Sequence, residues 1–161
     1  MRYARITSAL AAAVLVLALA APTRATTTRI PVSLDEPLIE VIAWSDTWGD
    51  TVQQARGYEA SYAVDFGGDI GAGVATVRAN YSMNLTTGHG TLWGTIVYDL
   101  GDGGFTGTFT GKWVWSEDAV WVGRTVSHGF GDLAGWQLRT QIVEIAHELV
   151  TEEGFIFMPG S

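Results

Sequence analysis

Aromatic side chains are the most abundant groups in this sequence that could hold a small molecule. The chain has seven tryptophans and five tyrosines among 161 residues, more than an average core needs. Aromatic walls offer a large apolar contact area with few hydrogen-bonding demands, so they favour apolar or ring-shaped ligands. We expect such a ligand site to be formed by Tyr62, Tyr81, Trp93, Tyr98, Trp113, Trp115 and Trp136. The alternative is that these side chains simply fill the protein interior.

Catalytic and metal-binding motifs are sparse. The three histidines lie in separate segments without ligand spacing. His147-Glu148 begins like a zinc-protease helix, but position 151 is a threonine, so the second histidine is missing. The sequence therefore predicts no metal and no cofactor. His128, at a strand end before a glycine-rich loop, is a weak candidate for acid–base catalysis. No phosphate loop, dinucleotide fingerprint or nucleophile elbow is present.

Composition and charge exclude several classes of protein. The absence of cysteine excludes a disulfide scaffold, a thiol nucleophile and a cysteine–zinc site. The formal net charge of −8 argues against nucleic acid and anionic membrane surfaces as partners, because both require a basic footprint. An apolar content of 47% excludes disorder, and the length suits one domain.

The first 25 residues are typical of a secretory signal peptide. A positively charged start precedes an unbroken apolar run over residues 9–21, and small residues follow over 22–25. Cleavage after Ala20 or after Ala25 fits the small-residue rule. The run is shorter than a membrane span needs. We therefore expect a secreted protein, extracellular or periplasmic, with no membrane contact after cleavage and a single domain over residues 26–161.

Alternation of apolar and polar residues runs through the mature chain and predicts strands. We expect eight of them, at residues 36–44, 56–66, 73–85, 91–99, 105–115, 119–128, 135–146 and 153–158. Turns are expected at 86–90, 101–104, 116–118, 129–135 and 151–154. A short helix is the alternative for residues 145–152. Glycines inside the strands, such as Gly94, Gly107 and Gly111, are expected to bend a strand or to let a large neighbour lie across it.

A meander of eight strands must hide its edges and bury one face, and closure does both. We therefore predict an all-β fold, a closed antiparallel eight-stranded β-barrel. The apolar stripes are expected to face inward, which places Arg78, Asn80 and Arg139 on the outer surface.

Glycine and aromatic residues recur in a particular pattern over residues 80–145. The chain reads WGT at 93–95, alternates glycine with phenylalanine over 103–111, and reads HGFGDLAG at 128–135. This pattern resembles that of small secreted bacterial proteins whose fold is similar to the allene oxide cyclase and dirigent barrel, a calycin-like meander. The resemblance implies a barrel that acts on or binds hydrophobic molecules, and it implies a homo-oligomer. No residue aligns with the catalytic set of either group, so no catalytic role is carried over.

Several functions remain open at this point. The first is the binding of a small hydrophobic or aromatic ligand inside the barrel. The second is a cofactor-free isomerase or cyclase of the allene oxide cyclase/dirigent type, which works largely by confining a reactive conformer. The third is a non-catalytic protein-interaction module with a filled barrel. A fourth, an outer-membrane barrel, fits poorly with outward faces rich in Thr, Asn, Arg and Asp. The presence of an interior cavity discriminates the first two from the third.

Overall fold

The computed structural model describes residues 27–113, 121–145 and 149–160. The predicted signal peptide, Trp115, the turn at 116–118 and His147 lie outside these residues. The described part consists of strands β1 (Thr28–Ala43), β2 (Asp46–Trp48), β3 (Val52–Asp65), β4 (Ala72–Asn84), β5 (Gly90–Asp99), β6 (Gly103–Trp113), β7 (Trp121–Gly131), β8 (Gln137–Ile145) and β9 (Leu149–Met158).

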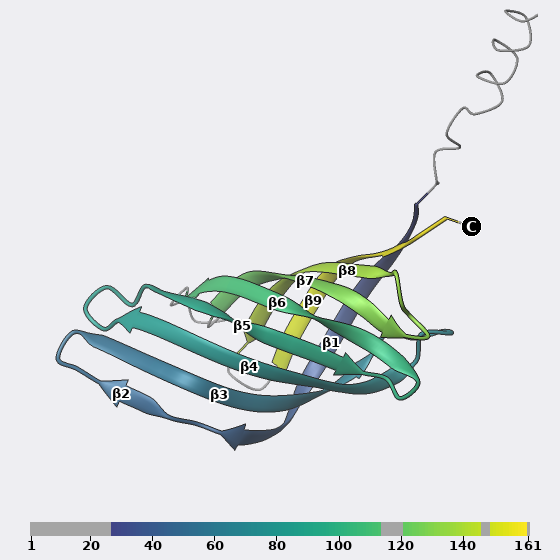
Figure 1. Cartoon of the computed structure of the whole chain (residues 1–161). Coiled ribbons are helices and arrows are strands. Elements are labelled where there is room, and N and C mark those ends of the chain that lie inside the picture. The colour runs from purple at the N-terminus through teal and green to yellow at the C-terminus, as the bar shows by residue number, and fades with distance from the viewer. Residues whose placement is uncertain (1–26, 114–120, 146–148, 161) are drawn as a thin grey trace, which may run out of the picture.

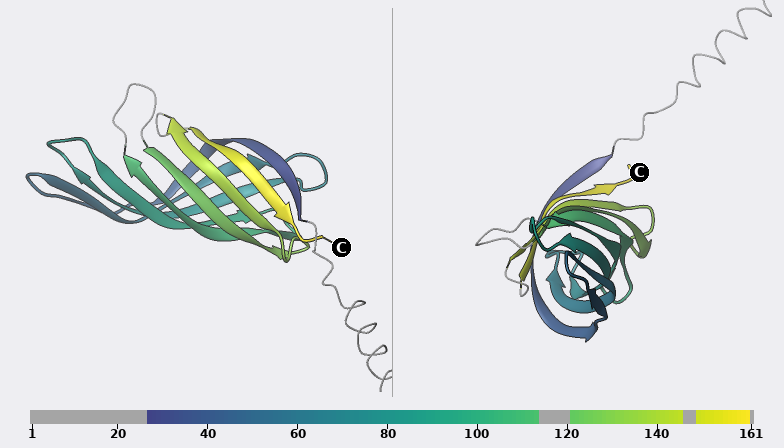
Figure 2. Two further views of the ribbon diagram at one scale, coloured as in Figure 1. Left: turned by 90° about the horizontal axis from the view of Figure 1, so that it is seen from above. Right: turned by 90° about the vertical axis from the view of Figure 1, so that its left-hand side faces the viewer.

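These strands form one closed antiparallel β-barrel. Each strand from β3 to β9 pairs with the next along the chain. The first ten residues of β1 pair with β9, and its remaining part pairs with β3, so this one long strand closes the sheet. The short strand β2 adds to the free part of β3. Figure 1 shows the strand order, and the right-hand view of Figure 2 shows the strands curving around the interior. The predicted eight-stranded barrel is confirmed, with β2 as an extra strand.

Several predicted strand boundaries are wrong. β3 begins at Val52 rather than at 56, and β7 ends at Gly131 rather than at 128. The first and last strands are also longer than predicted. The first strand begins at Thr28 rather than at 36, and the last begins at Leu149 rather than at 153. The predicted turn at 151–154 and the helix over 145–152 are therefore also wrong for the residues that the structure describes. Prolines and charged residues hide the alternation there: Glu36 and Glu152 occupy inward positions where an apolar residue was expected.

The predicted inward faces of the middle strands are confirmed. Residues 75, 79, 81 and 83 of β4 are buried, and Val77 is half-buried. Phe105 and Phe109 of β6 are buried as well, and they alternate with exposed threonines. Leu85 is an exception, because β4 ends before it and its side chain is 38% exposed. Arg78 and Arg139 point outward as expected, and Arg78 forms an ion pair of 2.9 Å with Glu59 on the outer surface.

One end of the barrel interior is tightly filled. This is the end where the β3–β4, β5–β6 and β7–β8 connections turn and where the start of β1 lies beside the end of β9 (Figure 2). Phe66 packs against Tyr98 and Phe105, each at 5.6 Å between ring centroids. Leu138 and Ile156 complete this layer, and both are fully buried.

Glycines inside the strands make room for the large side chains, as predicted. A Cβ atom at Gly94 would lie 2.7 Å from the ring of Phe109, and one at Gly111 would lie 2.7 Å from the ring of Trp121. Gly107 faces Ser127 in the same way. These rings can therefore lie across neighbouring strands toward the centre of the barrel.

Candidate functional site

The half of the barrel beyond the filled layer contains a cavity of about 340 Å³. All eight strands of the closed barrel contribute to its wall. Small-molecule sites in proteins are clefts of roughly 300–1,000 Å³ with mostly apolar linings and a few polar groups. This cavity has that size, and its wall has that composition.

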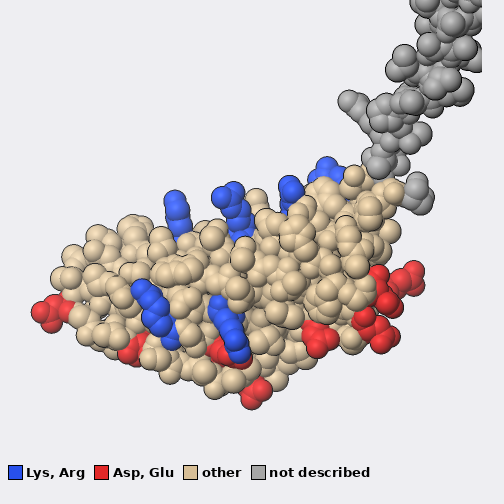
Figure 3. Space-filling model, viewed as in Figure 1, with Lys and Arg blue, Asp and Glu red and all other residues tan. Residues whose placement is uncertain are grey.

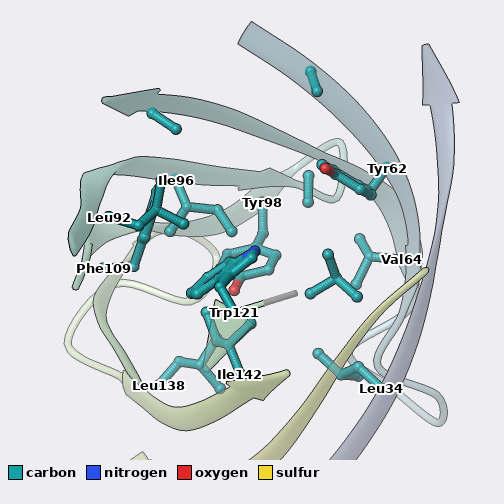
Figure 4. Packing of buried hydrophobic residues seen from close by; sticks show 14 of the residues in the cluster. Leu34, Tyr62, Val64, Leu92, Ile96, Tyr98, Phe109, Trp121, Leu138 and Ile142 are labelled. Atoms are coloured by element: carbon teal, nitrogen blue, oxygen red, sulfur yellow. The ribbon is translucent and has the colours of Figure 1, made fainter. Parts of the chain in front are cut away.

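Aromatic rings form a large part of the cavity wall. Trp121 of β7 packs on Phe109 of β6 at 5.7 Å between ring centroids. Trp113 meets the ring of Tyr81 edge-on at 5.8 Å. Figure 4 shows Trp121 projecting into the middle of the interior. A ring in this position is enclosed by protein on several sides and still faces the cavity.

A second aromatic group lines the side of the cavity formed by β1 and β3. Tyr58 and Tyr62 lie two inward positions apart on β3, and the ring of Trp44 contacts Tyr58 edge-on at 5.9 Å. Trp44 is 58% exposed, so it marks the outer edge of the cavity. Burial raises the pKa of both tyrosines above the ordinary value of 10, so both remain neutral hydroxyl groups.

Three carboxyl groups face the cavity from neighbouring strands. Glu36 lies on β1, Glu152 on β9 and Glu144 on β8, and β9 is the middle strand of the three. Glu36 and Glu144 both stand opposite Val150 of β9, so they occupy one row across the sheet, and Glu152 is two residues further along β9. Diagonal neighbours of this kind are separated by roughly 7–8 Å between backbones, within reach of long side chains.

Glu152 is held by two hydrogen bonds. The Tyr98 hydroxyl donates to Oε1 at 2.7 Å, and the Thr140 hydroxyl donates to Oε2 at 2.5 Å. Since Tyr98 comes from β5, on the other side of the barrel from β9, its bond crosses the interior and separates the cavity from the filled layer. Burial raises the pKa of Glu152 to about 7, although both hydrogen bonds lower it.

Glu36 is buried without any partner. Its side chain is 1% exposed, and neither carboxyl oxygen has a hydrogen-bond partner among the described residues. Burial, followed by the charge of Glu152, raises the pKa of Glu36 to about 9. The group therefore keeps its proton at neutral pH while the cavity is empty. A buried polar group with unmet hydrogen-bonding capacity is costly, so it marks a place where an additional partner would stabilise the structure.

No basic side chain lines the cavity in the part of the chain that the structure describes. Every lysine, arginine and histidine of that part is exposed. Figure 3 shows lysine and arginine side chains projecting from the outer surface of the barrel. His128 is exposed on the outer face of β7, so the structure does not bring this candidate acid–base residue to the cavity.

The aromatic residues predicted to bind a ligand are placed differently by the structure. Tyr62, Tyr81 and Trp113 line the cavity. Tyr98 points inward but lies below the cavity, as the donor to Glu152. Trp93 is on the outer face of β5, 38% exposed, with the Arg56 guanidinium 5.2 Å from its ring centroid. The expectation that Trp93 lines the interior must therefore be corrected, because its neighbours in the alternation, Leu92 and Gly94, take the inward positions.

Trp136 is half-buried at the turn before β8 and packs on the core rather than on the cavity. Glu36 and Glu152 were missed altogether, and Glu144 was not among the residues predicted to bind a ligand. A signal for them was present, since Glu36 continues the inward series after Val32 and Leu34, and Glu144 continues the series after Thr140 and Ile142. Continuing the inward–outward alternation of each strand past its polar residues would have identified both.

The fold and the site together define a closed β-barrel with an aromatic and acidic internal cavity. No protein-family model matches the chain, and no curated protein is similar enough to match it. Within the described residues, no group of three or more His, Asp and Glu side chains is close enough to hold a metal ion. None of the described segments is a helix that could cross a membrane.

Proposed function

We propose that this protein binds a small hydrophobic or aromatic molecule inside its β-barrel. The observation that carries the proposal is the cavity of about 340 Å³ with aromatic walls from strands all around the barrel. Protein interiors are normally close-packed, with few voids larger than a water molecule. Apolar cavities of this kind take up apolar molecules readily.

The contrast between the two halves of the barrel supports the proposal. In the layer around Phe66, Tyr98 and Phe105, aromatic rings pack directly against one another in the interior. The cavity is therefore a local feature and not a general consequence of eight strands. This contrast favours ligand binding over an interaction module with a filled barrel. The signal-like residues 1–25 lead us to infer that binding takes place outside the cytoplasm.

The buried carboxyl of Glu36 favours a second candidate, a cofactor-free isomerase or cyclase as implied by the resemblance. A carboxyl whose pKa burial raises to about 9 can pass a proton to a molecule confined beside it. Turnover of the bound molecule, lost when Glu36 becomes glutamine, would distinguish this activity from simple binding.

Titration with N-phenyl-1-naphthylamine, a neutral apolar dye that brightens in apolar surroundings, tests ligand binding. We expect a saturable rise in dye fluorescence with the native protein. Val77→Phe adds a ring to a side chain that lines the cavity, so we expect the dye affinity to fall by about tenfold or more as the ring takes up the space.

The matched control is Val97→Phe, the same substitution at a valine that is 38% exposed on the outer face of β5. It should leave the dye affinity unchanged. Equal affinities for the two variants, or no saturable binding to the native protein, would contradict binding inside the barrel.

A further inference from the structure

The carboxyl oxygens of Glu36 are hydrogen-bond acceptors in the cavity wall that could accept bonds from a ligand. Both of its carboxyl oxygens are buried and have no hydrogen-bond partner within the described ranges, and its side chain lines the cavity. Glu152, on the adjacent strand, has one donor on each oxygen, and a carboxylate can accept further bonds. Together these two groups offer acceptors for a ligand that brings several donors to one point.

Among the described residues, the charges around the cavity are all of one kind. The titratable groups that face Glu36 from the surrounding strands are Glu152 of β9, Glu144 of β8, Tyr58 and Tyr62 of β3, and Tyr98 of β5. None of these groups can become positive. An anionic ligand would meet only like charges, whereas a cation would find opposite charges in a medium of low dielectric constant, where their attraction is strong.

The aromatic residues of the cavity wall indicate the chemical nature of the rest of the ligand. Phe109, Trp113 and Trp121 line the same cavity as the carboxyl groups. Phe109 packs on Trp121, and Trp121 stands opposite Glu144 in the β7–β8 pair. Such rings take up an apolar or aromatic body, and their faces also attract a nearby cation.

The geometry points to a small apolar or aromatic amine, bound in its protonated form, with its ammonium group on Glu36 and Glu152 and its body among the aromatic rings. This inference rests on the proposed binding of a ligand inside the barrel and adds the chemical class of that ligand. An ammonium group has three donors and no acceptor, which matches the Glu36 carboxyl, without a donor among the described residues, and the further bonds that the Glu152 oxygens can accept. A hydroxyl group has one donor and no charge, so it could bond to only one carboxyl oxygen and would not attract the carboxylates.

Binding of such a cation is linked to proton release. The carboxyl of Glu36 keeps its proton in the empty cavity because burial raises its pKa, and an adjacent ammonium group favours the ionised form. The proton that Glu36 loses goes to the solvent as the ammonium group enters. The affinity for the amine should therefore rise with pH from about 6 to 8, as long as the ligand itself stays protonated.

The test compares two ligands of nearly equal shape, 1-naphthylmethylamine and 1-naphthalenemethanol, by isothermal titration calorimetry on the full mature protein at pH 7.5. We expect the native protein to bind the amine about ten- to a hundredfold more tightly than the alcohol, the range for charged hydrogen bonds. Titrations in two buffers that differ in ionisation enthalpy should show proton release with the amine and none with the alcohol.

Glu36→Gln keeps the shape of the side chain and prevents it from becoming charged when the amine enters. We expect it to weaken amine binding by about tenfold or more and to leave alcohol binding within about twofold. Glu153→Gln is the control, because Glu153 is the exposed neighbour of Glu152 on β9 and carries the same charge.

The other possible outcomes would overturn either the amine assignment or the proposed function. Equal affinities for the two ligands would overturn the amine assignment and leave ligand binding in place. Equal weakening of the amine by Glu36→Gln and Glu153→Gln would overturn it too, since the amine would then be bound by surface charge. Failure of both ligands with a protein that still takes up N-phenyl-1-naphthylamine would also overturn it. Failure of the dye as well would overturn the proposed function itself.

Discussion

The native protein is expected to lose stability as the pH rises from 5.5 to 8, and Glu36→Gln is expected to remove much of that loss. In the folded state burial raises the pKa of Glu36 to about 9, whereas a glutamate in the unfolded chain has an ordinary pKa of about 4.5. The folded protein therefore holds a proton that the unfolded chain releases. The stabilising contribution of that proton is fully present below pH 4.5 and is lost as the pH rises toward 9. Glu152, with a pKa raised to about 7, acts in the same direction.

The size of the effect follows from the same shift. Each pKa unit corresponds to about 1.4 kcal/mol, so the variant should gain on the order of 2–3 kcal/mol over the native protein between pH 5.5 and 8. Urea denaturation at both pH values, in 0.15 M salt to screen surface charge, measures this difference. Glu153→Gln makes the same change of charge on the outer surface and should show no such gain. A Glu36→Gln variant with the same advantage at both pH values would show that Glu36 is not buried as a neutral carboxyl.

The second large effect is expected from Trp121→Ala. Trp121 is 6% exposed, packs on Phe109, and lies over Gly111 and Gly123, whose added Cβ atoms would meet its ring at 2.7 and 2.6 Å. Removing the ring would enlarge the cavity at the expense of these contacts. We expect the free energy of unfolding to fall by about 3–5 kcal/mol, as for other buried large aromatic residues.

Trp93→Ala is the matched control, since Trp93 is 38% exposed on the outer face of β5. Its loss should cost about 1 kcal/mol or less. Urea midpoints for the two variants give the comparison directly. A similar cost for both tryptophans would mean that Trp121 does not pack inside the barrel, and the assigned cavity wall would then be wrong.

The fold was largely predictable because its middle strands follow a simple rule. In β4 to β6 the inward positions carry apolar or aromatic residues and glycines, and glycine-rich or polar turns separate the strands. The rule failed at β1 and β9, where Glu36 and Glu152 take inward positions. The alternation of residues also could not predict the strand register or the closure of the barrel. Both depend on the pairing of β1 with β9 and with β3, which are far apart in the sequence.

The candidate site was only half predictable for the same reason. Tyr62, Tyr81 and Trp113 were recognised because their type and their strand phase agree. Trp93 was predicted to bind the ligand because it is a tryptophan, although the alternation of β5 places it on the outer face. The carboxyl groups of Glu36 and Glu152 were not recognised, because an inward charged residue in a strand looks like the end of that strand until its partners across the barrel are known.

The tryptophan side chains inside the barrel can report directly on whether a ligand binds there. Indole N–H signals of the ¹⁵N-labelled mature protein can be followed while N-phenyl-1-naphthylamine is added. Trp113 and Trp121 line the cavity, whereas Trp48 and Trp93 are exposed at 63% and 38% and lie outside it. We predict saturable shifts of the Trp113 and Trp121 signals with the Trp48 and Trp93 signals unchanged. Shifts confined to Trp48 and Trp93, or no shift at any of the four, would contradict ligand binding inside the barrel.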